Sequence, residues 1–183
     1  MERDNVNDNF LRFPYRKQIH EDGRINNGGI DLTLEPKRIN EIHEAQNYPW
    51  LKKFLSEVNG PDGVFMTFGC DFGPYENYYA GYFDFSFRPS SRPASVETLR
   101  RLDDEFYVWI SDLYSDDTSE PHPLDFSRAM LLWSHSPLEY RGTFDKVGLW
   151  YRHQEVGGCE WLVNHVRHFL VEVYPALLAP NKK

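Results

Sequence analysis

The stretch that decides the fold is residues 78–87, YYAGYFDFSF, in which bulky aromatic residues alternate with smaller or polar ones. Successive side chains of an extended chain point to opposite faces, so every second residue shares a face. A period of two with many aromatic residues is typical of a strand in a sheet with one buried face. We therefore predict a strand over 78–87. Its buried face would carry Tyr79, Gly81, Phe83, Phe85 and Phe87.

Further strands are predicted on both sides of this one. Residues 64–70 would pair with 78–87 through a hairpin loop at 71–77, where a Gly-Pro dipeptide favours a turn. A second pair is predicted over 126–133 and 146–153, with Ser136-Pro137 among the turn signals between them. A short strand is also predicted over 30–34, because its apolar residues alternate with polar ones.

Four other segments have apolar residues at helical spacing. Pro36 can open the first of these helices, because proline is tolerated in a first turn. Pro175 is expected to kink or shorten the last turn of the final one. The predicted helices cover residues 36–46, 50–58, 95–114 and 159–178.

The resulting order of elements is β-α-α-β-β-α-β-β-α. Strands that come in adjacent pairs favour hairpins over parallel crossovers. We therefore predict an α+β fold with a mostly antiparallel sheet, built from two hairpins and covered by helices on one face. Residues 30–183 would form this single domain, and residues 1–29, which end in the turn signal NNGG, would form an N-terminal arm.

Length and composition restrict the class of protein. The chain has 183 residues, of which 16% are aromatic, and this argues against intrinsic disorder. No apolar run approaches the ~18 residues of a membrane span, and the first residues are too polar for a signal peptide. Cys70 and Cys159 are too few for a disulfide framework or a cysteine-rich zinc site. These features predict a cytoplasmic protein with two buried thiols and no cofactor.

The negative charge is concentrated in one segment. The formal net charge is −8, and residues 103–125 contain eight acidic residues and no Lys or Arg. The rest of the chain is therefore balanced, with 20 acidic and 20 basic residues. Direct binding to nucleic acid or to an anionic membrane is disfavoured, because both need a basic surface. An acidic surface would instead attract a cation, a metal ion or a basic protein.

Aromatic residues near the acidic segment make it a candidate protein interface. Tyrosine and tryptophan are enriched in interface hot spots, and complementary charge speeds association. The residues predicted to bind a partner are Asp112, Tyr114, Asp116, Asp117, Glu120 and Trp161.

A second candidate site lies on the final predicted helix. At 100° per residue, His165, His168 and Glu172 fall within about 60° of one another. These side chains could bind zinc or another divalent ion, or act as a general base with a carboxylate partner.

Other constellations carry weaker signals. The loop residues Asp71, Tyr75 and Glu76 could bind a sugar or act as paired carboxylates. Ser134 and His135 are neighbours on a strand, so they point to opposite faces and form no nucleophile–base pair. The sequence contains no nucleophile elbow, phosphate-binding loop, dinucleotide fingerprint or His-Glu-x-x-His motif.

These observations favour a binding protein over an enzyme. The leading hypothesis is an acidic domain that neutralises a basic protein partner by occlusion, as a bacterial toxin-immunity or inhibitor protein does. One alternative is a small hydrolase or metal-dependent enzyme that uses the His/His/Glu helix face. Another is a small-molecule sensor, with its ligand among Tyr79, Phe83, Phe85 and Trp150.

Overall fold

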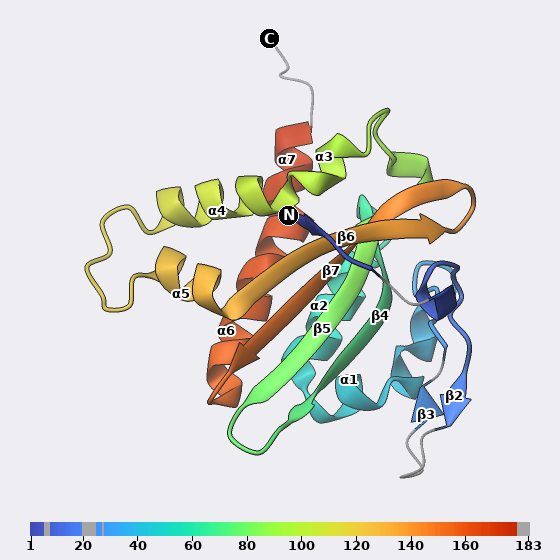
Figure 1. The fold of residues 1–183 in the computed structure, drawn as a ribbon, viewed down its shortest axis with the longest axis horizontal. Helices are drawn as coiled ribbons and strands as arrows, with labels where there is room; N and C mark the ends of the chain where they lie inside the picture. Colours follow the sequence, from blue (N-terminus) through green and yellow to red (C-terminus); the bar gives the residue numbers. More distant parts are fainter. Residues whose placement is uncertain (6–7, 20–24, 27, 179–183) are drawn as a thin grey trace.

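The computed structural model describes residues 1–5, 8–19, 25–26 and 28–178. The chain has an α+β fold with a five-stranded sheet in the order β1-β6-β7-β5-β4 (Figure 1). The four long strands pair antiparallel, and only the short β1 pairs parallel, with β6. The predicted fold class is thus confirmed. The strands of this sheet are β1 (Glu2–Arg3), β4 (Phe65–Pro74), β5 (Tyr79–Phe87), β6 (Leu131–Glu139) and β7 (Thr143–His153).

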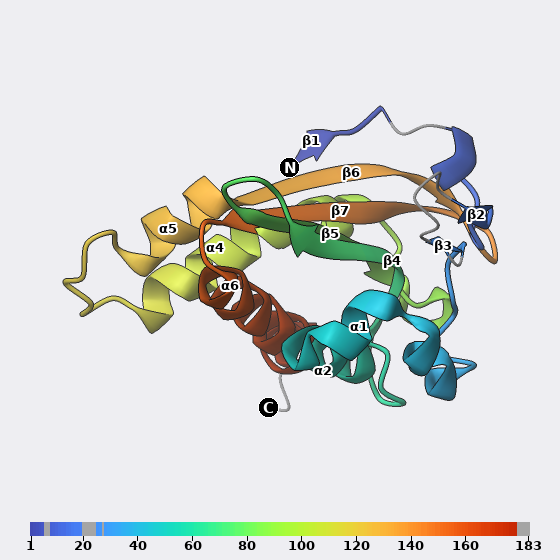
Figure 2. The same ribbon diagram turned by 90° about the horizontal axis from the view of Figure 1, so that it is seen from below.

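The helices cover one face of the sheet, opposite the N-terminal segment, except for α5, which lies beyond one end of the sheet (Figure 2). They are α1 (His43–Asn47), α2 (Pro49–Val58), α3 (Glu97–Arg100), α4 (Leu102–Leu113), α5 (Pro123–Met130), α6 (Val156–His168) and α7 (Tyr174–Leu178). Short 3₁₀ helices span Asp8–Phe10, Pro36–Glu41 and Pro89–Ser91, and a separate β2–β3 hairpin pairs Gln18–Ile19 with Ile25–Asn26. None of the described helices is both long and apolar enough to cross a membrane.

The predicted face of β5 is the centre of the core. Phe83, Phe85 and Phe87 are fully buried, and the Phe83 ring stacks on Phe54 of α2 at 4.1 Å between centroids. The same ring stacks on Tyr151 of β7 at 5.0 Å. The alternation read from the sequence therefore selects the residues that the helices cover.

The opposite face of the sheet is also partly buried, so the expectation of a single buried face was wrong. Residues of the predicted arm cover it: Phe13 and Tyr15 pack with Met66, Phe68 and Leu138 in a second apolar cluster. β1 extends the same segment along the edge of β6. At the end of the arm, Gly28 and Gly29 have φ values of +78° and +84°, which side chains other than glycine rarely adopt.

The predicted strand at 30–34 was wrong, because this segment forms a turn. Asp31 Oδ1 accepts hydrogen bonds from the backbone N–H and the hydroxyl of Thr33, at 3.0 and 2.5 Å. The Asp31 carbonyl also accepts from the amides of Leu34 and Glu35. This local side-chain capping competes with strand pairing.

The second predicted hairpin begins later than expected. Residues 123–130 form α5, because Pro123 occupies the first helical turn and His122 accepts a hydrogen bond from the Leu124 amide. β6 then continues through Pro137, where the sequence indicated a turn. β1 pairs with β6 only at Ser134 and His135, so the outer edge of β6 is unpaired at Pro137. The N–H that proline lacks is therefore not needed for a hydrogen bond between strands.

The two longest predicted helices are both interrupted. The helix expected over 95–114 is broken at Arg101 into α3 and α4. The final helix changes to a π segment, Phe169–Val173, between α6 and α7. Pro175 has no N–H to donate to the carbonyl four residues earlier, and this explains the altered winding just before it.

Candidate functional site

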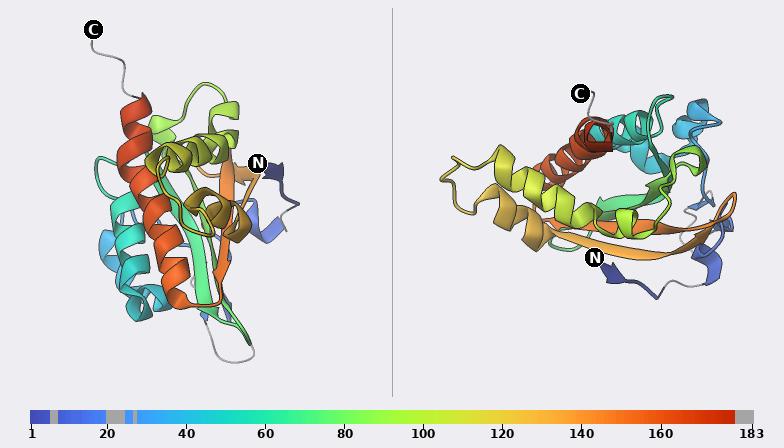
Figure 3. Two further views of the ribbon diagram at one scale, coloured as in Figure 1. Left: turned by 90° about the vertical axis from the view of Figure 1, so that its left-hand side faces the viewer. Right: turned by 90° about the horizontal axis from the view of Figure 1, so that it is seen from above.

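The acidic segment forms a helical hairpin, α4–loop–α5, that projects from one end of the sheet (Figures 1 and 3). Two acidic residues near the base of the hairpin are paired. Asp103 lies 2.7 Å from the amino group of Met1, and Glu105 lies 3.7 Å from Arg101. The base of the hairpin is therefore largely neutralised.

The rest of the acidic residues have no ion-pair partner among the described residues. They are Asp104, Asp112, Asp116, Asp117, Glu120 and Asp125, and all but the half-buried Asp117 are exposed. Most of them lie at the free end of the hairpin, in the last turn of α4, the loop and the first turn of α5. The segment therefore keeps its negative potential in the folded protein.

His122 holds the two ends of the acidic loop together. Its Nε2 lies 3.0 Å from the Tyr114 carbonyl at the end of α4, and its Nδ1 accepts from the Leu124 amide at 3.2 Å in α5. This pattern requires the neutral tautomer with the proton on Nε2. Within the loop, hydrogen bonds from Ser119 hold the pKa of the Asp117 carboxyl below its usual value. The backbone that carries the loop carboxylates is therefore held in place by side-chain hydrogen bonds.

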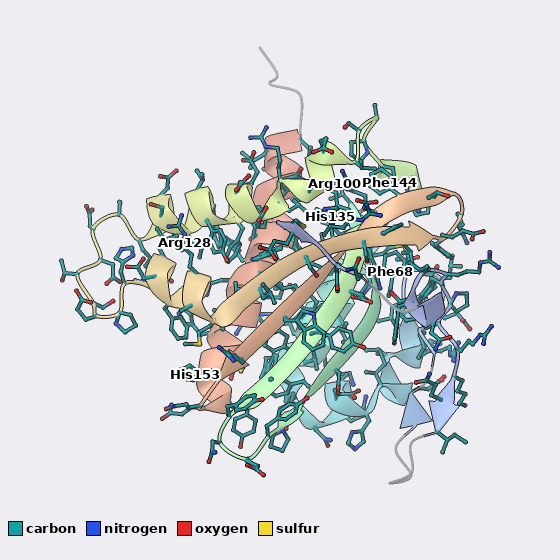
Figure 4. All side chains as sticks on the ribbon, viewed as in Figure 1. Phe68, Arg100, Arg128, His135, Phe144 and His153 are labelled. Carbon is teal, nitrogen blue, oxygen red and sulfur yellow. The ribbon has the colours of Figure 1, made fainter. Side chains whose placement is uncertain are left out.

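A groove of about 380 Å³ runs between α4 and α5. Figure 4 places Arg128 of α5 beside this groove, and its guanidinium lies 5.4 Å from the centre of the Tyr107 ring. Val108 on the groove and Leu113 near the tip are 59% and 51% exposed. The groove thus combines apolar side chains with carboxylates on its rim. Its lining residues are Asp104, Tyr107, Val108, Ser111, Asp112, Leu124 and Arg128.

Tyr114 and Trp161, both predicted to bind a partner, lie together beneath the tip. The Tyr114 hydroxyl donates to His165 Nε2 at 2.7 Å, and the Trp161 ring lies 3.8 Å from the His165 ring. Phe126 of α5 packs on Trp161 at 5.4 Å. These rings fasten the hairpin to α6. Their contact with a partner stays a prediction.

His165, His168 and Glu172 do not form a three-ligand group in the described part of the chain. Both ring nitrogens of His165 are used, because Nδ1 donates to the Trp161 carbonyl at 2.8 Å and Nε2 accepts from Tyr114. Burial lowers the pKa of His165 below its usual value. His168 pairs instead with Glu172 at 3.0 Å. No group of three potential ligands is assembled for a metal ion anywhere in the described part of the chain.

The other candidate residues are only partly brought together. Asp71 belongs to β4, whereas Tyr75 and Glu76 lie in the turn beyond it, so the three do not share one loop. Asp71 and Tyr75 line one cavity beside β4, and Glu76 is not among its lining residues. Ser134 donates to the Gly148 carbonyl while His135 contacts Asp145 at 3.0 Å, so the two do not pair, as predicted. In Figure 4 His135 lies near Arg100, which also donates a hydrogen bond to the Asp145 carboxylate.

The residues of the alternative small-molecule site do not share one face of the sheet. Phe83 and Phe85 are fully buried in the core, while Trp150 is 47% exposed on the opposite face of the sheet. The described structure instead has a cavity beside β4, lined among others by Glu44, Cys70 and Asp71. Sequence reasoning missed this cavity because its residues come from distant segments with no shared periodicity.

Comparison with known proteins does not assign the chain to a family. No protein-family model matches it, and neither a curated protein nor a solved structure is significantly similar to it. Its function has to be inferred from its own geometry.

Proposed function

We propose that the protein binds a basic protein partner through the α4–α5 hairpin and neutralises that partner by occlusion, as a bacterial toxin-immunity or inhibitor protein does. The observation that carries the proposal is the unpaired negative charge at the free end of a projecting, braced hairpin. A nucleic acid or an anionic membrane is not the proposed partner, because the same carboxylates repel phosphates.

Only the free end of the hairpin is available to obstruct a cleft. α4 packs on the core through Leu102, Phe106 and Ile110, and Tyr114 at its end is bonded to His165 of α6. The last turn of α4, the loop and the first turn of α5 can enter a basic cleft while the sheet stays outside. Lys and Arg side chains in such a cleft would face Asp116, Asp117 and Glu120 at the tip.

The charged and apolar residues of the hairpin would have different effects on binding. Exposed rim charges mainly raise the association rate through long-range attraction. The exposed side chains of Val108 and Leu113 would be removed from water in the complex, which slows dissociation. The half-buried Tyr114 and Trp161 support the tip from beneath.

A cytoplasmic location is part of the same proposal. Cys70 and Cys159 are both free thiols, which is typical of a reducing compartment. Cys159 is buried as predicted, whereas Cys70 is only partly buried.

The test starts with capture of the partner from the source cell and purification of both proteins. Association is then measured by stopped flow at several salt concentrations. The test variant is the triple substitution Asp116→Asn, Asp117→Asn and Glu120→Gln. The matched control changes three exposed acidic residues away from the hairpin, Glu76, Glu155 and Glu160, to Gln.

Both triple variants change the net charge equally, so any difference between them reports the position of the charge. We expect the hairpin variant to associate about tenfold more slowly and with a flatter salt dependence. The control variant should keep most of the wild-type rate. Equal rates and equal salt dependence for wild type and hairpin variant would reject the proposed electrostatic docking.

A further inference from the structure

Outside the hairpin, a cavity of about 370 Å³ lies along the outer edge of β4. β4 is the last strand of the sheet, so among the described residues no strand pairs with this edge. Five consecutive residues, 67–71, line the cavity. Because side chains alternate between faces, a continuous run of lining residues means that the cavity lies along the strand edge. Figure 1 shows α1 and the N-terminal segment beside this edge.

Aromatic rings form much of one wall. Tyr15 and Phe10 come from the N-terminal segment, Tyr82 from β5 and Tyr75 from the turn after β4. The Phe10 and Tyr15 rings are 5.1 Å apart in an edge-to-face arrangement. The Lys146 ammonium already lies over both rings, 5.7 Å from the centre of Phe10 and 4.7 Å from the centre of Tyr15. These two rings therefore offer an added ligand apolar contact.

Two carboxyl groups also line the cavity. They belong to Glu44 of α1 and Asp71 of β4, and the charge of Asp71 helps to raise the pKa of Glu44. Among the described residues, neither carboxyl forms an ion pair with Lys or Arg, and no Lys or Arg lines the cavity. The nearby buried cation, Lys146, is already paired with Asp84 and bonded to the Tyr15 hydroxyl. Among the described lining residues, His43 is the one basic side chain, and it lowers the pKa of Glu44 in part. The two carboxyl groups therefore line the cavity without a Lys or Arg partner.

We propose that this cavity binds a small organic cation, an ammonium or guanidinium group on an apolar or aromatic body. The N–H groups of the cation would donate to Glu44 and Asp71, and the body would lie against Tyr15, Tyr82 and Phe10. The volume is within the range of small-molecule sites, about 300–1,000 Å³. This site goes beyond the proposed partner binding, since its lining residues do not belong to the hairpin.

Burial, and then the neighbouring Asp71, raise the pKa of Glu44 above its usual value, although His43 lowers it in part. A cation that enters the cavity would lower this pKa again, because it stabilises the ionised carboxylate. The other titratable groups nearby, Cys70, Tyr82 and Tyr15, have pKa values raised by burial, so they supply no further negative charge.

The experiment uses two probes of matched shape, 2-phenylethylammonium and its neutral counterpart 2-phenylethanol. Binding to the full chain is measured by titration calorimetry. The test variants are Glu44→Gln and Asp71→Asn, both close in shape to the native side chains. Glu76→Gln is the matched control, because Glu76 is an exposed acid close in sequence to β4 that does not line the cavity.

We expect the cation to bind at least tenfold more tightly than the alcohol. Each test variant should weaken cation binding about tenfold or more, since a charge-assisted hydrogen bond is lost. Glu76→Gln should leave it unchanged. Equal affinity for both probes, equal affinity of wild type and both test variants, or no cation binding at about 10 mM overturns the proposal.

Discussion

The substitution Lys146→Met should destabilise the protein strongly, because it breaks a buried ion pair. Lys146 is 2% exposed and Asp84 is 7% exposed, and their charged groups are in direct contact. The Tyr15 hydroxyl donates to the same Asp84 oxygen at 2.7 Å and accepts from Lys146 Nζ at 2.7 Å. This three-residue network lies between the sheet and the N-terminal segment.

The expected cost follows from the charge that remains. Met fills much of the volume of the lysine stem, so little packing is lost. Asp84 would keep the hydrogen bond from Tyr15 but lose its counter-charge. Removal of one partner of a buried pair typically costs about 3–5 kcal/mol. Most domains of this kind are stable by only about 5–15 kcal/mol, so the effect should be large.

The assay is urea denaturation at neutral pH, with the free energy of unfolding extrapolated to water. Lys53→Met is the matched control, because Lys53 is 56% exposed and lies 4.0 Å from Glu57 in a surface pair. Such an exposed pair contributes about 0–1 kcal/mol. The double variant Lys146→Met with Asp84→Asn should cost less than the sum of the two single variants, because neither charge is then left alone.

Two results would refute this reasoning. One is a loss for Lys146→Met as small as that for Lys53→Met. The other is strict additivity of the Lys146 and Asp84 variants, since independent effects exclude a coupled pair. Either result would mean that water or a rearranged side chain satisfies the remaining charge.

Three further predictions concern pH and packing. The lowered pKa of His165 means that its contribution to stability is complete above about pH 6.5 and is lost as the pH falls further. His165→Gln should remove this part of the pH dependence in urea titrations. The raised pKa of Glu44 gives a pH dependence of the opposite sign: the protonated carboxyl stabilises the folded state, and this stabilisation is lost as the pH rises. Glu44→Gln should therefore stabilise the protein at pH ~7 and not at pH ~4. Gly81→Ala should cost about 1–3 kcal/mol in the same assay, because its Cβ would meet the Asp71 carbonyl and lie 2.7 Å from the Tyr151 hydroxyl.

Each of these outcomes has a clear opposite. An unchanged slope of stability against pH in His165→Gln would show that this imidazole titrates alike in the folded and unfolded chains. A loss of stability at neutral pH in Glu44→Gln would mean that its ionised form is the favoured one. Gly81→Ala at wild-type stability would mean that β4 and β7 move apart at no cost.

Sequence periodicity correctly predicted those strands and helices whose buried face follows from the spacing of apolar residues within the element itself. The alternation over 78–87 identified the buried face of β5, and the apolar spacing over 50–58 identified α2. It failed where local polar groups override the pattern. At 30–34 the Asp31 side chain caps a turn, and at 123–130 a proline and a histidine cap start a helix. Alternation alone carries no information on such caps.

For the candidate site, the sequence by itself determined that the negative charge is gathered in residues 103–125, because charge can be counted along the chain. Only the tertiary structure decided which of these carboxylates stay unpaired, since Met1 approaches Asp103 from far away in the sequence. The hydrogen bond between His165 and Tyr114 also depends on the tertiary structure. The same is true of the cavity in which Glu44 and Asp71 lie near the rings of the N-terminal segment. These contacts join residues far apart in the chain, and no local pattern of side chains fixes how such segments meet in space.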